Sequence, residues 1–407
     1  MRLSRKLGAA RLASAVMLAA LPLSQVQAEG IYFEMAGKVS GELRYFTEEA
    51  QFAGQDQETN ISFAAEPEFF WEWNEGSDSL TFTPFLRVDQ HDDERTHGDI
   101  RELSWIHVGE DWELRAGLRK VFWGVTEFQH LVDVINQTDA VEDFDGEDKL
   151  GQQMVNLSLV RDWGILDLFL LPGFRERTFA GDDGRLRFGL PVLTDRATYE
   201  SAAGENHLDT AIRWSHSVDV YDMGVYWFHG TGRDPVLQLQ NVNGQPSLVP
   251  HYQQVDQIGF DLQATIDSWL WKLELLWQDN NTESYSAVQG GFEYTLYGIS
   301  DTAWDLGLLM EYGWDERRED APVSAQNDLF FGARLALNDA ESTEVLAGIS
   351  HDLDFDSQGL IVEASRRYGD NWKASIDGRF FYADDPADPA YSFRKDDHLQ
   401  LTVERFF

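Results

Sequence analysis

Charged side chains recur at alternate positions in many short stretches of this 407-residue sequence, and they are the groups best able to bind a polar molecule. Lys38, Glu42 and Arg44 form one such series, and Arg87 and Asp89 begin another. Charges of both signs are costly in a dry core but tolerable beside water or beside each other. The pattern therefore indicates a wet, charge-lined interior. The residues expected to line it are Arg44, Arg87, Asp89, Arg115, Arg119, Asp209, Arg213, Asp261, Lys272, Glu274, Glu311, Arg334 and Arg379.

Acid–base catalysis is a second chemistry to consider, because two acidic stretches contain histidine. One is 91–97 (H-D-D-E-R-T-H), and the other pairs His229 with Asp234. Spacing cannot establish the mutual geometry that proton transfer requires. The sequence also has no Gly-x-Ser-x-Gly or His-Glu-x-x-His motif. We therefore expect no catalytic residue, no metal ligand and no cofactor.

The composition and the amino end narrow the class of protein. A formal net charge of −39 argues against nucleic acid as a partner, and the absence of cysteine excludes disulfides and thiolate metal sites. A basic start (M-R-L-S-R-K) precedes the apolar stretch 12–23, which is too short to span a bilayer, and the segment closes on V-Q-A at Ala28. This is the pattern of a cleaved secretory signal. We expect a signal peptide over 1–28 and a single domain over 29–407.

The elements that would position the interior charges are β-strands, because successive side chains of a strand point to opposite faces. The clearest case is a hairpin over 257–278, where Ile258, Phe260 and Leu262 alternate with polar residues. Eighteen such segments follow one another, an even number that suits a bacterial single-chain barrel. Sixteen strands would also fit, because 98–108 and 165–171 alternate poorly. The predicted segments are 35–46, 60–73, 80–90, 98–108, 112–122, 152–161, 165–171, 207–215, 218–228, 257–266, 269–278, 286–299, 303–314, 328–337, 343–351, 359–368, 371–382 and 397–407.

The last segment carries a signature of its own. Its apolar residues share one face, and the chain stops on an aromatic residue. This ending resembles that of Gram-negative outer-membrane β-barrel proteins, whose final strand ends in Phe and is recognised by the barrel-assembly machinery. Arg405 departs from that pattern, which usually has an apolar residue there. The residues expected to close the barrel are Leu399, Leu401, Val403 and Phe407.

The resemblance implies an all-β fold, a transmembrane antiparallel up-and-down barrel in the bacterial outer membrane. Its partners would be outer-membrane lipid, lipopolysaccharide and the assembly machinery. The segments 397–407 and 35–46 should then be hydrogen-bonded neighbours, since a closed barrel leaves no sheet edge exposed to lipid. Tight turns such as 369–370 alternate with long connections such as 172–205, so we expect short periplasmic turns and long external loops.

The connection 123–151 is the best candidate to narrow such a barrel. Phe128, Leu131, Val132 and Ile135 recur at helical spacing, which predicts a short helix packed inside the barrel mouth. A loop folded over the rim explains the same residues nearly as well. The residues expected to form the constriction are Trp123, Glu127, Phe128, His130, Asp133 and Asn136.

A short stretch at the start of this connection, 119–124 (R-K-V-F-W-G), is similar to one in a largely uncharacterised family of porin-like outer-membrane proteins. In that family a basic strand end runs into Trp-Gly. The resemblance implies a channel-like barrel and names no substrate.

These observations together predict a porin-like channel for passive diffusion of small polar or charged solutes. The alternative is a barrel with a filled lumen that acts as a structural or adhesive surface protein, and a barrel hydrolase is less favoured. The external stretch 172–205 holds five arginines among acids, so it is either an anion-recognising surface or a solvated mixed-charge loop. The sequence leaves the solute and loop gating open, and it is compatible with a homo-oligomer.

Overall fold

The computed structural model describes residues 26–28, 30–55, 58–143, 145–323 and 325–407. Most of the predicted signal peptide therefore lies outside the described residues. Its last part, β1 (Val26–Ala28), pairs with the start of the next strand. Within the described part of the chain, no helix is long and apolar enough to span a membrane.

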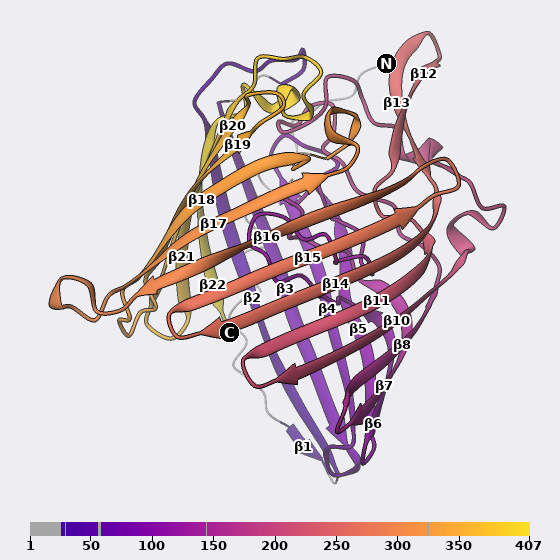
Figure 1. Ribbon diagram of the computed structural model, residues 1–407, viewed down its shortest axis with the longest axis vertical. Helices are drawn as coiled ribbons and strands as arrows, with labels where there is room; N and C mark the ends of the chain where they lie inside the picture. Colours follow the sequence, from indigo (N-terminus) through magenta and orange to yellow (C-terminus); the bar gives the residue numbers. More distant parts are fainter. Residues whose placement is uncertain (1–25, 29, 56–57, 144, 324) are drawn as a thin grey trace.

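Eighteen antiparallel strands form a closed barrel in the described residues, since β1 is the remaining member of the nineteen-stranded main sheet. Figure 1 shows them following one another in sequence order around the barrel. The number and the order confirm the predicted fold. The strands are β2 (Ile31–Phe46), β3 (Thr59–Trp73), β4 (Asp78–Asp89), β5 (Gly98–Val108), β6 (Trp112–Arg119), β7 (Gln152–Arg161), β8 (Gly164–Pro172), β10 (Leu208–Val218), β11 (Tyr221–Thr231), β14 (Gln254–Ile266), β15 (Trp269–Asp279), β16 (Ser284–Leu296), β17 (Asp305–Asp315), β18 (Asn327–Ala336), β19 (Glu344–Asp352), β20 (Gln358–Tyr368), β21 (Trp372–Tyr382) and β22 (His398–Phe406).

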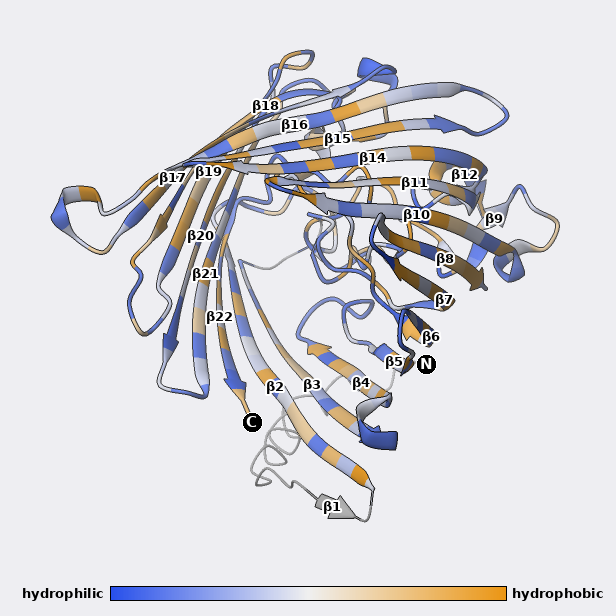
Figure 2. Cartoon of the chain, turned by 60° about the horizontal axis from the view of Figure 1, so that its bottom comes forward, coloured by the Kyte–Doolittle hydropathy of each residue, from blue (hydrophilic) through white to orange (hydrophobic). Residues whose placement is uncertain are grey.

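Alternation along most of the strands separates an apolar outer face from a polar inner one. In the β14–β15 pair, Phe260 lies opposite Leu275 on the outer face, and Asp261 lies opposite Glu274 on the inner face. Figure 2 shows hydrophilic and hydrophobic residues alternating along the barrel strands. An apolar exterior around a polar interior is the reverse of a soluble protein and is typical of a membrane barrel.

The barrel closes where the two ends of the domain meet. β22 pairs with β2 from Lys38↔Phe406 to Phe46↔His398, and Gly37 and Phe407 exchange two backbone hydrogen bonds of 3.1 Å. Leu401 is 42% exposed on the outer face. The inward neighbour Gln400 accepts a hydrogen bond from Arg44. The predicted pairing of the first and last strands is therefore confirmed.

The poor alternation of 98–108 has a local cause. The register between β4 and β5 shifts at Thr83/Pro84, so β5 has one extra residue there. The outward side chains of β5 are therefore even-numbered before the shift and odd-numbered directly after it. The pairs Ala65↔Leu86 and Phe69↔Phe82 share one register, which places Pro67 opposite Pro84. Neither proline can donate to the ladder. A β-bulge beside two facing prolines thus hides a regular strand from a simple pattern.

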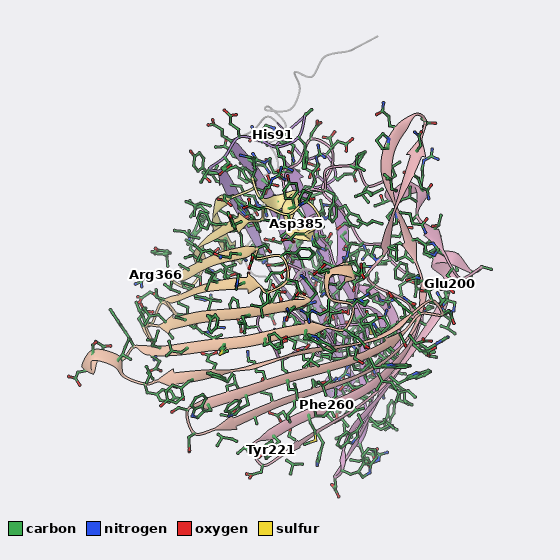
Figure 3. All side chains as sticks on the ribbon, turned by 45° about the horizontal axis from the view of Figure 1, so that its top comes forward. His91, Glu200, Tyr221, Phe260, Arg366 and Asp385 are labelled. Carbon is green, nitrogen blue, oxygen red and sulfur yellow. The ribbon has the colours of Figure 1, made fainter. Side chains whose placement is uncertain are left out.

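The two ends of the barrel differ as expected. The shortest turns, such as 162–163, 219–220 and 267–268, lie at one end, although the other end also has two short connections, 280–283 and 353–357. The long connections lie at the other end, where Figure 3 places the labelled loop residues His91, Glu200 and Asp385, away from Tyr221. A small sheet of β9 (Thr198–Tyr199), β12 (Val236–Val242) and β13 (Gln245–Tyr252) stands beside this mouth and was not predicted.

Candidate functional site

The connection between β6 and β7, residues 120–151, folds into the barrel lumen and is named here the inner loop. Two buried carboxylates on the barrel wall hold its backbone. Glu274 of β15 accepts hydrogen bonds from the N–H groups of Val125 (2.6 Å), Thr126 (3.0 Å), Leu131 (2.6 Å) and Val132 (3.3 Å). This single side chain therefore fixes two separate turns of the loop.

Glu311 of β17 does the same for the loop tip, accepting from the N–H groups of Glu127 (2.8 Å) and Phe128 (2.9 Å). The prediction of a helix over these residues is wrong, because the described part of the inner loop contains none. The physical reason lies in the donors: N–H groups that would bond to carbonyls in a helix bond to wall carboxylates instead. The helical spacing of apolar residues reflects packing on two sides of an irregular loop.

One side of the inner loop packs into a dry, apolar part of the lumen. Trp123, Val132 and Ile135 are buried against inward residues of β7, β8, β10 and β11. The Trp123 ring lies 5.0 Å from that of Tyr226 and 5.7 Å from that of Phe169. Trp123 is thus a core residue of the lumen.

This apolar part of the lumen was missed by the sequence reasoning, which assigned apolar positions to lipid. The sequence of β11 did indicate it: Val225, Tyr226, Trp227 and Phe228 are all apolar, so neither face of the strand is polar there. Val225 and Trp227 are exposed outside, whereas Tyr226 and Phe228 are buried inside. A strand that is apolar on both faces must bury one of them against protein.

The loop tip packs on the opposite wall. Phe128 stacks on Phe330 of β18, with ring centroids 5.2 Å apart and planes 9° apart. Beside it, the Glu127 carboxylate pairs with Arg334 (2.6 Å) and Lys272 (3.4 Å). These contacts bring together two predicted constriction residues and two predicted lining residues.

Two further predicted constriction residues brace the inner loop internally. Asp133 accepts from the backbone N–H of Trp123 (2.5 Å) and Gly124 (2.9 Å). Asn136 bonds to the backbone of both ends of the loop, at Val121, Arg119 and Leu150.

His130 lies between two carboxylates, with Nε2 3.0 Å from Glu147 and Nδ1 3.8 Å from Glu274. Burial by itself would lower the pKa of His130, but these two carboxylates outweigh it and raise the pKa to about 10. An imidazolium at neutral pH therefore pairs with Glu147 of the loop and, at a distance too long for a hydrogen bond, with Glu274 of the β15 wall.

The second half of the inner loop is clamped to the wall formed by β2, β4 and β5. Arg87 donates to both carboxylate oxygens of Glu142 (Nε–Oε1 3.0 Å, Nε–Oε2 2.8 Å), and Arg101 pairs with Asp139. Arg95, from the β4–β5 connection, pairs with Asp89 (2.9 Å) and was not predicted. We call this network the arginine clamp; its members are Glu42, Arg44, Arg87, Asp89, Arg95, Arg101, Asp139 and Glu142.

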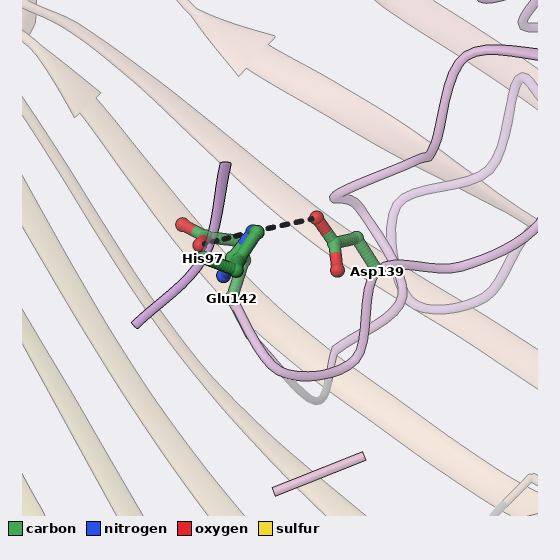
Figure 4. A group of neighbouring side chains, drawn as sticks. All are labelled: His97, Asp139 and Glu142. Atoms are coloured by element: carbon green, nitrogen blue, oxygen red, sulfur yellow. Dashed lines mark ion pairs between the residues drawn. The ribbon is translucent and has the colours of Figure 1, made fainter. Parts of the chain in front are cut away.

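His97 joins the edge of this clamp, as Figure 4 shows. Its Nε2 lies 3.5 Å from Glu142 and 3.9 Å from Asp139, a grouping of ligand types that could hold a metal ion. Arg87 and Arg101 already bind the same carboxylates. A cation at this point would compete with two guanidinium groups, so the grouping serves the clamp better than a metal.

The remaining predicted lining residues also lie on inward positions, mostly in pairs. Arg213 and Asp261 form a bidentate pair of 2.6 and 2.9 Å. Asp209 pairs with Arg233 (2.9 Å). The others are distributed along the wall: Arg115 pairs with Glu113, Arg379 pairs with Glu363, and Arg119 has no ion pair within the described residues.

The residues considered for catalysis are not brought together. His229 pairs with Asp256 (3.0 Å), whereas Asp234 pairs with Arg177 (2.8 Å). Asp92 accepts hydrogen bonds from neighbouring backbone N–H groups and from Gly181. These carboxylates organise loops at the mouth.

The basic stretch 172–205 is folded over the mouth and is not solvated throughout. Arg185 is buried and pairs with Asp396 (2.6 Å), and Arg175 pairs with Asp99 (2.8 Å). These contacts tie the stretch to strand β5 and to the connection between β21 and β22.

Two cavities lie on either side of the arginine clamp. The larger, of about 200 Å³, lies against the inner faces of β2, β3, β4 and β22, and the smaller, of about 30 Å³, lies nearer the mouth. Arg44, Arg95, Glu142 and Asp143 border both. These four side chains therefore separate the outer space from the inner one.

Comparisons with known proteins support the fold. No protein-family model matches the sequence, and no curated protein matches it. Among solved structures, Pseudomonas aeruginosa OpdQ matches with a TM-score of 0.52 and 10% identity, covering 94% of this chain and 99% of that one. A mutant of the Rhodopseudomonas blastica porin matches with a TM-score of 0.45 and 11% identity, covering 92% and 100%. The match to OpdQ shows that the chain shares the barrel fold of that protein.

Proposed function

We propose that this protein is an outer-membrane channel for passive diffusion of small polar or charged solutes, narrowed by the inner loop. One observation carries the proposal: the loop fills one side of the lumen with apolar side chains and leaves a polar cavity on the other. A porin-like fold and an inward-folded loop are what a size-limiting channel requires.

The proposed route runs along the wall of β2, β3, β4 and β22. There the inward side chains are charged or polar, as at Lys38, Glu66 and Thr402. On the far side, β7, β8, β10 and β11 are sealed against the loop by Trp123 and Ile135. A polar solute could replace part of its hydration shell by contacts with these polar groups, so it would pass along the wall of β2, β3, β4 and β22.

A second candidate function is a barrel with a filled lumen. The arginine clamp favours it, because Arg44, Arg95, Glu142 and Asp143 stand between the two cavities. A structural or adhesive surface protein would need such a seal to stay shut. In a channel the same four residues would be the narrowest point.

A planar-bilayer recording on the purified full-length protein separates the two candidates. We expect discrete conductance steps, and Glu142→Gln should enlarge them, because it removes the carboxylate that Arg87 holds across the partition. Glu113→Gln is the matched control, since Glu113 is an inward carboxylate that pairs with Arg115 and does not touch the loop. A wild-type protein without any steps would refute the channel and support the sealed barrel.

The surroundings of such a channel would include lipid, lipopolysaccharide and the assembly machinery. The apolar outer face would contact lipid, the external rim would contact lipopolysaccharide, and the strand ending at Phe407 would be recognised by the barrel-assembly machinery. Residues 1–28 would be removed on export.

A further inference from the structure

The larger cavity contains charges that the arginine clamp does not use. Most charged residues that border it are paired, for example Lys38 with Glu404 (3.0 Å) and Arg87 with Glu142 (2.6 Å). Within the described residues, three others in its lining make no hydrogen bond or ion pair through their side chains: Lys120, Glu66 and Asp148. One ammonium and two carboxylates therefore face the same wet space without partners.

These three groups come from two different elements that meet at the cavity. Lys120 and Asp148 stand near the two ends of the inner loop, and Glu66 lies on β3. Asp148 and Glu66 both lie within electrostatic range of the Lys120 ammonium, yet neither contacts it. Asn136 bonds to the backbone of Arg119, Val121 and Leu150, which fixes the two ends of the loop from which Lys120 and Asp148 extend.

Leaving partly buried charges unpaired is costly, and a bound molecule can remove that cost. Burial, with Arg101 nearby, lowers the pKa of Lys120. Burial, with Glu142 and Asp143 nearby, raises the pKa of Asp148. In both cases burial is the main cause, and the nearby opposite charges do not offset it.

A simple ion would satisfy only part of this set. An anion would bind Lys120 but add repulsion with Glu66 and Asp148. A cation would bind the two carboxylates but leave Lys120 beside Arg101 without a partner. A molecule that carries both charges a few bonds apart satisfies all three groups.

We infer that this cavity binds a small zwitterion of the α-amino-acid type, with its carboxylate on Lys120 and its ammonium between Glu66 and Asp148. A space of about 200 Å³ is smaller than the roughly 300–1,000 Å³ of sites for drug-sized ligands, which limits the ligand to a few heavy atoms beyond the charged groups. The inference rests on the proposed function for the access of solute to the cavity, and it names the solute class of that channel.

The test is an equilibrium titration of the detergent-solubilised full-length protein with glycine, observed by saturation-transfer NMR on the glycine protons. Acetate and methylammonium, each carrying one of the two charges of glycine, are the matched probes. We expect glycine to bind more tightly than either. Equal binding of acetate or of methylammonium would overturn the inference.

The variants locate the site. Lys120→Met should weaken glycine binding about tenfold or more, the loss expected for one charge-assisted hydrogen bond, whereas Lys120→Arg should retain most of it. Lys149→Met is the control, because Lys149 belongs to the same loop and donates to Thr138 outside the cavity. Unchanged affinity in Lys120→Met would place glycine elsewhere and overturn the assignment.

The bilayer recording keeps the two proposals distinguishable. Conductance steps without glycine binding would leave the channel standing and refute the zwitterion site. Glycine binding without conductance steps would leave the site standing and refute the channel.

Discussion

Glu274 is completely buried, yet the sequence marks it only as one of many inward charges. The structure gives it a distinct task, because its two oxygens accept four backbone N–H groups of the inner loop and the Thr126 hydroxyl. A carboxylate that receives several donors forms stronger hydrogen bonds than a neutral group would. At the residue scale, the loop is thus shaped by acceptors on the wall and only secondarily by its own side chains.

Replacing this carboxylate tests its role. Glu274→Gln leaves one oxygen and places an NH₂ group against loop N–H donors, so we expect a loss of at least about 3 kcal/mol in the free energy of unfolding. Urea unfolding followed by tryptophan fluorescence measures it, and protease cleavage within the inner loop should become faster. Glu113→Gln should be close to wild type. Equal stability of the two variants would mean that apolar packing alone holds the loop.

At the scale of elements, the strands and the inner loop follow different rules. Each strand is set by local alternation between two environments, and β22 obeys it at every position from Leu399 to Arg405. Arg405 stands where an apolar residue is usual, and it lies at the end of the strand. Its guanidinium is 5.6 Å from the centre of the Trp372 ring. The inner loop has no such repeat and is ordered by contacts with β15, β17 and β18.

The orientation of β22 gives a prediction with an internal control. Leu401→Arg places a charge on the outer face of the closing strand, which we expect to cost about 2–4 kcal/mol if it lies near the bilayer midplane. Thr402→Arg places the same side chain at nearly the same depth on the inner face, opposite Glu42 of β2, and should cost much less. Refolding into lipid vesicles from urea measures both. Equal costs would mean that the outer face does not meet lipid.

At the scale of the whole molecule, the excess of acidic residues surrounds a lumen whose charges are mostly paired. The formal net charge of −39 is therefore not concentrated at the clamp, where arginines balance carboxylates. In the proposed channel, it would act as a long-range field at the two mouths and would raise the local concentration of cations there.

This field predicts a salt-dependent selectivity. Under a KCl gradient, the reversal potential should show a preference for K⁺ near 0.1 M salt and a weaker one near 1 M. The reason is that the screening length falls from about 10 Å to about 3 Å over that range. A preference that does not change with salt would instead place the selectivity at fixed contacts inside the lumen.

The strands, their number, the pairing of β22 with β2 and the asymmetry of the two ends could all be read from the sequence. The physical reason is that a strand between lipid and water must alternate at period two, a signal contained within about ten neighbouring residues. Where a bulge and two facing prolines broke that signal, at Thr83 and Pro84, the strand was still present but its pattern was blurred.

The tertiary structure alone decided how the lumen is filled. Glu274 bonds to Thr126 across 148 residues of sequence, and Arg95 and Glu142 meet only because the inner loop crosses the barrel. No repeat in the sequence connects such distant residues. The spacing of apolar residues in the inner loop therefore suggested a helix, whereas carboxylates on the barrel wall hold this segment as an irregular loop. The three unpartnered charges of the larger cavity are a product of the same long-range contacts. Local periodicity determined the barrel, and contacts distant in sequence determined its interior.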